Sequence, residues 1–350
     1  SNMALRGVDL FCGGGGSSQG AADAGVHMVG AVDRWNIATM TYADNFPTAR
    51  GNVVTTTLGD ETCGKIFNSV GRVDLLIASP ECTNHSLARG NRPRCEDSRR
   101  SGWYVARFIE DLNPEYIILE NVAMMRHWEG FQSFWEALEK RYGFKLRAQV
   151  LDAADFGVPQ NRKRLFFLGD RRSSPAEVLP TVKQHVPASK IIDKPGKWRA
   201  GPLDNGRRAV ATLERVRHGI EQIGRGKDFI TVYYGSDKAG GYQTLDRPLR
   251  TLTTLDRFGL VQWQAKHPTL RMLQVPELKR AMGLRSDFVM RHGTRRDQVK
   301  LLGNGVCPPV MEAVVKALLN RRSHQFSISL DASRKRRPAR GNSVRKSEAV

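Results

Sequence analysis

The fold is decided by the stretch VDLLIASPEC, residues 73–82. Residues 73–78 are a short and mainly apolar run between Gly71 and Pro80, which is typical of a buried strand. Pro80 cannot continue a sheet ladder, so the strand is expected to end before it. Cys82 is then predicted to lie on a loop at the carboxyl end of a strand, where open α/β sheets carry their chemistry.

A second apolar run ends in the same manner. Residues 116–119 predict another strand, and Glu120 and Asn121 follow it directly. A thiol and a carboxylic acid at the ends of two strands favour covalent catalysis with proton transfer. The alternative for Cys82 is inert packing, since free cysteines are among the most buried residues. The polar residues 81–86 around it favour an accessible thiol instead.

The first half of the chain alternates strand and helix patterns. Helical spacing of apolar residues predicts helices at 103–112 and 131–138, and another helix is expected to begin near Ser17 and Ser18, a good capping pair. Apolar runs predict further strands at 8–11, 28–32, 145–151 and 165–169. This alternation predicts an α/β fold with a parallel, helix-covered sheet.

The composition changes after the last of these strands, where prolines, glycines and basic residues dominate. One helix is predicted there at about 209–223, and strand-like pieces follow at 229–234 and 250–254. Near the end, Pro308 and Pro309 open an apolar helix that belongs to the core of the first domain. The predicted divisions are a catalytic first part (3–172), a small second domain (173–290), a C-terminal segment completing the first (291–325) and a basic disordered tail (326–350).

The charge of the chain indicates a polyanionic partner. Its 350 residues carry 55 Lys and Arg against 35 Asp and Glu, a formal net charge of +20 at pH 7. This excess favours nucleic acid, because phosphate contacts supply most nonspecific affinity, although solubility or membrane affinity would also explain it. No apolar stretch approaches the roughly 20 residues that span a bilayer, and no secretory signal is visible. Five scattered cysteines indicate a reducing compartment, the cytoplasm.

Residues 12–16, a cysteine followed by four glycines, come after one strand and open a helix. Their amides can approach a ligand closely, but the spacing lacks the third glycine of the dinucleotide fingerprint. Asp33 ends the next strand and is placed to accept hydrogen bonds from ribose hydroxyls. An ordinary tight turn and a solvated carboxylate are the alternatives. Together the two features favour a cofactor that carries a nucleoside.

Two motifs in the second half are weaker by themselves. The run QNRKR, residues 160–164, precedes a strand and places Arg162 and Arg164 on one face, where they would hold phosphates or another anionic group. A solvated basic turn is the alternative. The run GNGV, residues 303–306, is a bland turn when taken alone.

Taken in order, these stretches resemble a known family, the DNA (cytosine-5) methyltransferases of bacterial or phage type. Six motifs are similar: DLFCGGGG (9–16), SPEC (79–82), ENV (120–122), QNRKR (160–164), RPLRT (247–251) and GNGV (303–306). The resemblance covers nearly all of residues 7–320. It implies a Rossmann-like methyltransferase domain with a smaller target-recognition domain, acting as a monomer on double-stranded DNA.

The resemblance also implies S-adenosylmethionine as the cofactor. Asp33 would hold its ribose, and Asp60 would lie near its adenine. The residues expected to line the site are Phe11, Gly13, Gly15, Asp33, Asp60, Asn304 and Val306. No metal is expected, because His85 and Cys95 match no zinc spacing.

The reaction that the resemblance implies is covalent. Cys82 would add to C6 of a cytosine flipped out of the duplex, while Glu120 would hydrogen-bond the N3 edge of the base. Arg162 and Arg164 would organise that pocket. The base then takes a methyl group at C5, loses the C5 proton and expels Cys82.

Two residues depart from the family pattern. Glu81 replaces the usual proline and would slow formation of the Cys82 thiolate, and Thr83 replaces the usual glutamine. Two rival interpretations stay open: a transfer-RNA methyltransferase of the same lineage and a catalytically silent DNA-binding homologue. Neither the DNA recognition sequence nor a companion restriction nuclease is assigned. Candidates for base contacts are Arg199, Arg207, Arg208 and Arg225.

Overall fold

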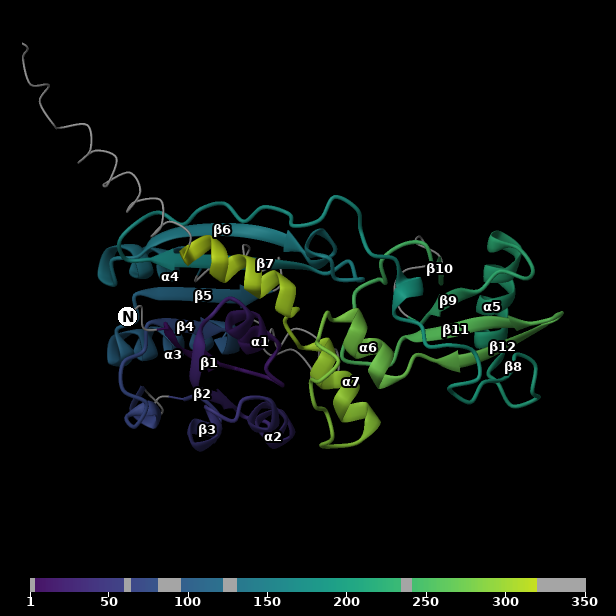
Figure 1. Cartoon of the computed structure of the whole chain (residues 1–350), viewed down its shortest axis with the longest axis horizontal. Helices are drawn as coiled ribbons and strands as arrows, with labels where there is room; N and C mark the ends of the chain where they lie inside the picture. Colours follow the sequence, from purple (N-terminus) through teal and green to yellow (C-terminus); the bar gives the residue numbers. More distant parts are fainter. Residues whose placement is uncertain (1–3, 60–63, 81–95, 122–130, 234–240, 320–350) are drawn as a thin grey trace, which may run out of the picture.

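The computed structural model describes residues 4–59, 64–80, 96–121, 131–233 and 241–319. Two sheets lie toward opposite ends of an elongated molecule, and α6 (Val275–Ala281) and α7 (Arg295–Gly303) lie between them (Figure 1). Within the described ranges, no helix is long and apolar enough to cross a membrane.

The larger sheet has seven strands in the order β3-β2-β1-β4-β5-β7-β6. Their bounds are β1 Arg6–Leu10, β2 His27–Asp33, β3 Val53–Thr55, β4 Leu75–Ala78, β5 Tyr116–Asn121, β6 Lys145–Asp152 and β7 Lys163–Asp170. The apolar runs predicted at 73–78 and 116–119 form β4 and β5, which pair in parallel. The carboxyl ends of these two strands therefore lie side by side.

One strand runs against the others, so the prediction of an entirely parallel sheet is wrong. β7 pairs antiparallel with β5 on one side and with β6 on the other. Only residues 153–162 separate β6 from β7, whereas a parallel crossover needs a dozen or more residues. As a result, the start of β7, with Arg164, lies beside the end of β5, with Glu120.

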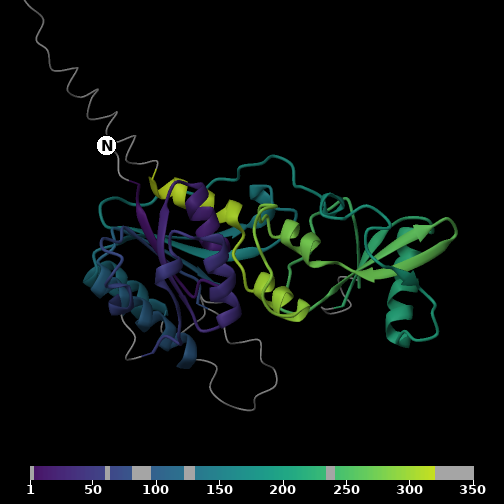
Figure 2. The same cartoon turned by 60° about the horizontal axis from the view of Figure 1, so that its bottom comes forward.

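Helices cover both faces of the larger sheet (Figure 2). They are α1 Gly16–Asp23, α2 Asn36–Asn45, α3 Glu96–Leu112, α4 Phe131–Glu136 with the π-helix Ala137–Arg141, and a last helix at 308–319. Short 3-10 helices lie at Arg50–Asn52, Gly64–Phe67, Ala153–Phe156 and Ala188–Lys190.

The two faces carry separate apolar cores. Leu76 and Ile117 belong to the core with α3 and α4, whereas Ile77 and Ile118 belong to the core with α1 and the last helix. Successive side chains of a strand point to opposite faces. Strands covered on both sides are therefore continuous apolar runs, as these are.

The predicted serine cap of α1 is wrong. Gly15 is the N-cap, in a left-handed conformation with a φ of 105°. A Cβ atom at Gly15 would lie 2.5 Å from the ring of Phe46, so this position requires glycine. Ser17 and Ser18 lie inside the first turn, and their hydroxyls donate to the carboxylate of Asp9.

The smaller sheet has five antiparallel strands in the order β10-β9-β11-β12-β8. Their bounds are β8 Gly201–Pro202, β9 Phe229–Val232, β10 Tyr242–Thr244, β11 Phe258–Gln264 and β12 His267–Met272. The predicted helix is α5 (Val210–Ile223), which packs on this sheet through a small apolar core. The strand predicted at 250–254 is not formed, because Leu252 bonds to side chains of the larger part. The residue limits of the domains stay a prediction.

Candidate active site

The candidate site lies at one edge of the larger sheet. β2, β1, β4 and β5 are parallel neighbours in that order, so their carboxyl ends meet at the same edge. The chain places there the glycine loop (residues 11–15), Asp33, Pro80, and the pair Glu120 and Asn121.

Glu120 is held at this edge by the antiparallel pairing of β5 with β7. Its side chain is buried, and its Oε1 lies 3.5 Å from the Nε of Arg164. Burial raises the pKa of Glu120, and the positive charges of Arg164 and Arg162 oppose that rise only in part. A carboxyl with a raised pKa is suited to donate a proton or a hydrogen bond to a bound base.

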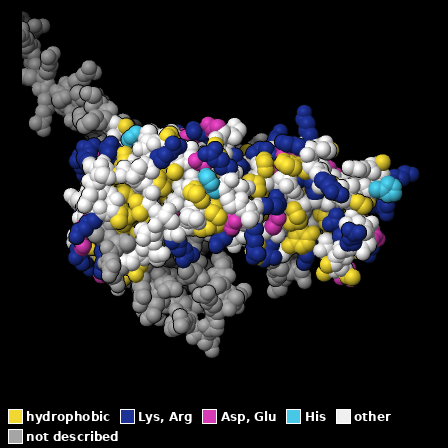
Figure 3. Space-filling model, turned by 90° about the horizontal axis from the view of Figure 1, so that it is seen from below, with side chains coloured by type: hydrophobic (Ala, Val, Ile, Leu, Met, Phe, Trp, Pro, Cys, Tyr) yellow, Lys and Arg dark blue, Asp and Glu magenta, His cyan; other side chains and the backbone are white. Residues whose placement is uncertain are grey.

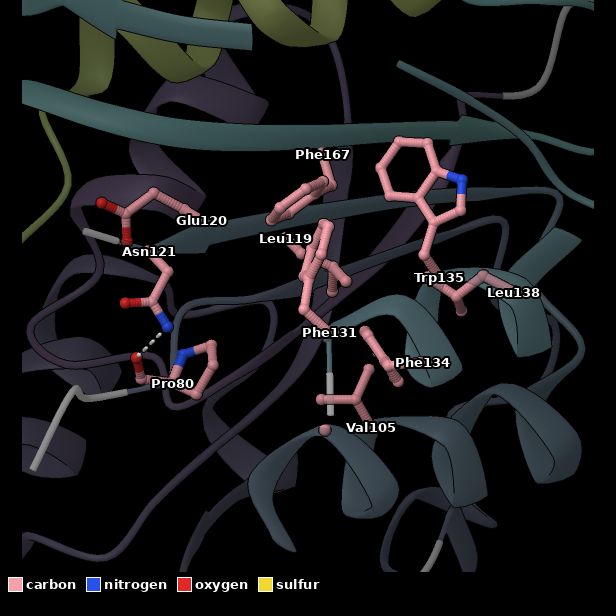
Figure 4. A pocket seen from close by; sticks show the side chains of 11 residues that line it. Pro80, Val105, Leu119, Glu120, Asn121, Phe131, Phe134, Trp135, Leu138 and Phe167 are labelled. Atoms are coloured by element: carbon pink, nitrogen blue, oxygen red, sulfur yellow. Dashed lines mark hydrogen bonds between the residues drawn. The ribbon is translucent and has the colours of Figure 1, made fainter. Parts of the chain in front are cut away.

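Asn121 connects the strand of Glu120 to the neighbouring strand end. Its Nδ2 donates to the carbonyl oxygen of Pro80 at 3.4 Å (Figure 4). Pro80 precedes Cys82 by two residues in the sequence. Cys82 itself lies outside the described residues, so its role as nucleophile stays a prediction.

Other predicted residues also lie outside the described residues: Asp60, Glu81, Thr83, His85 and Cys95. Among the residues that the structure describes, no group of three or more His, Cys, Asp or Glu side chains is placed to hold a metal ion.

An apolar pocket lies behind Glu120, between β5, β7, α3 and α4 (Figure 4). It encloses about 430 Å³ of empty space, part of it open to solvent. The Glu120 carboxylate points away from the aromatic rings of this pocket, so the apolar wall lies behind the acid. Its apolar lining is Val105, Leu119, Phe131, Phe134, Trp135, Leu138 and Phe167. The sequence pattern identified 131–138 only as a helix.

Asp33 has a structural role that the sequence did not indicate. Its Oδ2 accepts a hydrogen bond from the amide of Gly13 at 2.9 Å, and its Oδ1 accepts from the amide of Trp35 at 2.9 Å. Phe11 and Gly13 both have positive φ angles, of 55° and 52°. Asp33 therefore fixes the glycine loop at Gly13, next to a turn in which Phe11 adopts a conformation that is costly for any residue other than glycine.

Asp9 is a buried acid that the motif search left without a function. Its Oδ2 accepts from the hydroxyls of Ser17 at 2.6 Å and Ser18 at 2.7 Å, and Tyr42 donates to Ser18 in turn. Its Oδ1 has no hydrogen-bond partner among the described residues. Burial raises the pKa of Asp9 to about 7, the two serines lower it, and Asp33 raises it further. A titratable acid thus lies against the first turn of α1.

The C-terminal loop 303–306 reaches this edge from the other end of the chain. A Cβ atom on Gly16 would lie 2.2 Å from the carbonyl oxygen of Val306, so this loop lies against the start of α1. Val306 is buried and Asn304 is exposed. The structure therefore brings Asn304 and Val306 close to the glycine loop.

The two arginines of the QNRKR motif have different surroundings. Arg164 faces Glu120. Arg162 is buried and donates to the carbonyl oxygens of Leu252, Gly303 and Gly305. The two arginines therefore contact different groups, and their role in organising the base pocket stays a prediction.

Comparison with known proteins agrees with this arrangement. The family model of the C-5 cytosine-specific DNA methylases matches residues 5–320. The chain belongs to this family. This DNA methylase is 27% identical over 344 residues to the Type II methyltransferase M1.HphI of Haemophilus parahaemolyticus, a match covering 92% of this chain and 89% of the relative. It is 29% identical over 261 residues to the Type II methyltransferase M.HgiDI of Herpetosiphon aurantiacus, covering 71% and 80%.

Solved structures share the fold. A DNA modification methyltransferase encoded within an Escherichia coli prophage matches the DNA methylase with a TM-score of 0.64 at 20% identity, over 91% of this chain and 100% of that one. The methyltransferase EhMeth of Entamoeba histolytica matches with a TM-score of 0.66 at 16% identity, over 92% and 99%. The predicted family, enzyme class and Rossmann-like methyltransferase fold are confirmed.

Proposed function

We propose that this DNA methylase transfers a methyl group from S-adenosylmethionine to C5 of a cytosine flipped out of duplex DNA, through an adduct between Cys82 and C6. The observation that carries the proposal is Glu120. It is a buried acid with a raised pKa, next to Arg164 and one residue before the Asn121 that contacts Pro80. An acid so placed can act on the base that the thiol attacks.

The chemistry of cytosine explains why both groups are needed. C5 by itself is a poor nucleophile. Addition of the Cys82 thiolate forms an S–C6 bond and moves an electron pair of the ring to C5. Glu120 hydrogen-bonds to N3 and offsets the negative charge that the addition creates. When bound, S-adenosylmethionine supplies the methyl group. Loss of the C5 proton then restores the ring and expels the Cys82 thiolate.

The residues around the glycine loop fit a cofactor with positive charge. Folds that bind pyrophosphate hold it at a helix N-terminus, whereas here the carboxyl of Asp9 lies against the first turn of α1. A phosphate would be repelled there, but the sulfonium and ammonium groups of S-adenosylmethionine would be attracted. Phe11, the glycine loop, Asn304 and Val306 would hold the rest of the molecule, and Asp60 stays a prediction.

The proposed substrate is duplex DNA, and the surface charge supports it. Figure 3 shows Lys and Arg side chains spread over the face that it presents, across both parts of the molecule. Of the arginines considered for base contacts, Arg208 donates to the carbonyls of Pro202 and Leu270 and thus serves the fold. Arg225 lies 5.8 Å from the ring centroid of Trp263. The target base must leave the stack to reach Glu120.

Trapping on 5-fluorocytosine tests the covalent step. Fluorine at C5 cannot leave as a proton does, so the methylated adduct should accumulate on a duplex containing 5-fluorocytosine. With S-adenosylmethionine present, we expect a species with the mass of protein plus DNA plus the transferred methyl group. Cys82→Ser should abolish it while S-adenosylhomocysteine still binds. A wild-type protein that binds S-adenosylhomocysteine and forms no adduct on any duplex would contradict the proposal, and an adduct only with transfer RNA would favour an RNA substrate.

A further inference from the structure

The contacts of Arg162 are those of a residue that orders the chain around the site. Its guanidinium donates at 2.8 Å to the carbonyl oxygen of Leu252, at 2.7 Å to that of Gly303 and at 3.0 Å to that of Gly305. Gly303 and Gly305 flank Asn304 on both sides. Two of its three hydrogen bonds therefore fix the loop that presents Asn304 toward the proposed cofactor.

We propose that Arg162 is a positioning residue, which holds the C-terminal loop 303–306 in the conformation that receives S-adenosylmethionine and ties this loop to the segment 249–252. The inference deepens the proposed function and rests on its choice of cofactor. It assigns contact with the flipped base to the side of Arg164 and Glu120, and contact with the cofactor loop to Arg162.

Backbone packing supports the tie between the loop and the segment. A Cβ atom on Gly303 would lie 2.1 Å from the carbonyl oxygen of Thr253, so the two backbones touch. Glycine at 303 allows this approach. The guanidinium of Arg162 connects the same two segments, because it donates to Leu252 and to Gly303.

Gln160 extends this bridge toward the smaller sheet. Its Nε2 donates to the carbonyl of Ala281 at 2.9 Å, and its Oε1 accepts from the amide of Leu252 at 2.8 Å. The amide of Asn161 donates to Leu249, and Thr251 donates back to Asn161. The segment 249–252 is part of the connection between β10 and β11 of the smaller sheet. A shift of that sheet would therefore reach the cofactor loop through Arg162.

The charge of Arg162 suits this role. Burial, and next the neighbouring Arg164, lower the pKa of Arg162 to about 10, which leaves the guanidinium protonated at neutral pH. Its three acceptors are carbonyl oxygens of the backbone, so the guanidinium fixes the path of the chain at Leu252, Gly303 and Gly305. Lysine has one compact ammonium group and cannot span three acceptors in the geometry of a guanidinium.

Arg162→Lys tests the proposal by calorimetric titration with S-adenosylhomocysteine in the absence of DNA. We expect the dissociation constant to rise about tenfold or more, the KM for S-adenosylmethionine to rise in proportion, and kcat at saturating cofactor to change by less than about threefold. The matched control is Arg271→Lys, which removes half of a buried two-point ion pair between Arg271 of β12 and Glu277 of α6. This control should lower the stability of the protein without weakening the binding of S-adenosylhomocysteine.

A lowered kcat with unchanged affinity for S-adenosylhomocysteine would overturn the proposal, because it would place Arg162 at the base. The same titration works if the protein proves inactive, so its failure is distinct from failure of the proposed function. Hydrogen–deuterium exchange of the wild-type protein decides the matter if Arg162→Lys does not fold. S-adenosylhomocysteine should slow exchange in peptides covering 249–254 as well as 302–306, and protection confined to 302–306 would contradict the tie.

Discussion

At the residue scale, the titration of Asp9 links the site to stability. Burial raises its pKa to about 7, from an ordinary value of 3.8. Between these two pH values the folded chain holds a proton that the unfolded chain has lost. The stability that Asp9 contributes is therefore complete below about pH 4 and is lost as the pH rises through 7. A buried carboxyl that costs stability at neutral pH is expected to serve a function. We propose that Asp9 attracts the cationic cofactor.

Asp9→Asn should remove this loss. The amide keeps an acceptor for Ser17 and Ser18 but carries no charge. We expect the free energy of unfolding at pH 8 to rise by up to about 4 kcal/mol and its decline between pH 4 and 8 to flatten. Urea unfolding across this range measures both effects. S-adenosylmethionine, which carries the sulfonium charge that S-adenosylhomocysteine lacks, should bind more weakly to the variant.

The control is Asp170→Asn. Asp170 is also buried and accepts hydrogen bonds from Arg172 and Ser173, but it pairs with Tyr116 at the opposite edge of the sheet. It should leave the affinity for S-adenosylmethionine unchanged. If Asp9→Asn lowers stability at pH 8, the explanation offered for Asp9 is wrong.

Burial raises the pKa of Glu120, and the charge of Arg164 opposes that rise. If Glu120 acts in its protonated form, kcat/KM falls as the pH rises through its pKa. Arg164 lowers that pKa, so Arg164→Gln should raise it and move the alkaline limb of the pH profile to higher pH. The rate at the optimum should fall about ten- to a hundredfold, because the pocket loses its cation. Kinetics on plasmid DNA from pH 6 to 10 measure both.

Lys163→Gln controls for the loss of one positive charge next to Arg164. Lys163 is exposed and adjacent in sequence, so its removal should leave the alkaline limb in place. If the alkaline limb of the pH profile of kcat/KM does not move in Arg164→Gln, Glu120 does not determine that limb.

At the scale of secondary structure, α1 depends on glycine where the last helix crosses it. A Cβ atom on Gly20 would lie 2.4 Å from the carbonyl oxygen of Pro308 and 2.7 Å from the Cβ of Met311. Alanine in place of glycine normally stabilises a helix by up to about 1 kcal/mol. Gly20→Ala should instead destabilise the protein by about 1–3 kcal/mol, since neither backbone can yield. Thermal unfolding measures the sign.

Gly51→Ala is the control for this substitution, because no atom lies within 4 Å of the Cβ position there. Its melting temperature should stay within about 1 °C of the wild type. A melting temperature raised by Gly20→Ala would show that the last helix is not packed on α1 as described.

Strands and helices with one local cause were predictable from the sequence. β4 and β5 follow from apolar runs that end at Pro80 and Glu120, and α5 follows from helical spacing. The direction of β7 was not predicted, because it depends on the short connection from β6. The segment 250–254 was misjudged as a strand, because its hydrogen-bond partner Gln160 is remote in the chain.

The site shows the same division. Glu120 and the glycine loop were recognised because each directly follows a strand. The role of Arg162 was not, because its acceptors Leu252 and Gly303 lie 90 and 141 residues away in the sequence. Asp9 was overlooked for a different reason. Inside β1 it resembles any other strand residue, and only the hydrogen bonds from Ser17 and Ser18 show that its carboxyl is held against α1.

At the scale of the whole molecule, we propose that methyl transfer takes place at the edge of the larger sheet and that basic side chains on both parts contact the DNA. Arg162 connects the two parts, because it donates hydrogen bonds both to the segment 249–252 and to the loop 303–306. The net charge of +20 would draw the phosphate backbone to both parts. All of this presupposes one reaction, the methylation of cytosine at C5.

Nucleoside analysis of methylated DNA tests that reaction most directly. Duplex DNA is incubated with the full chain and S-adenosylmethionine, digested to nucleosides and analysed by mass spectrometry. We expect 5-methyldeoxycytidine with the wild-type protein and none with Cys82→Ser. A folded protein that binds S-adenosylhomocysteine but yields no 5-methyldeoxycytidine on any duplex, or that methylates adenine instead, would contradict this expectation.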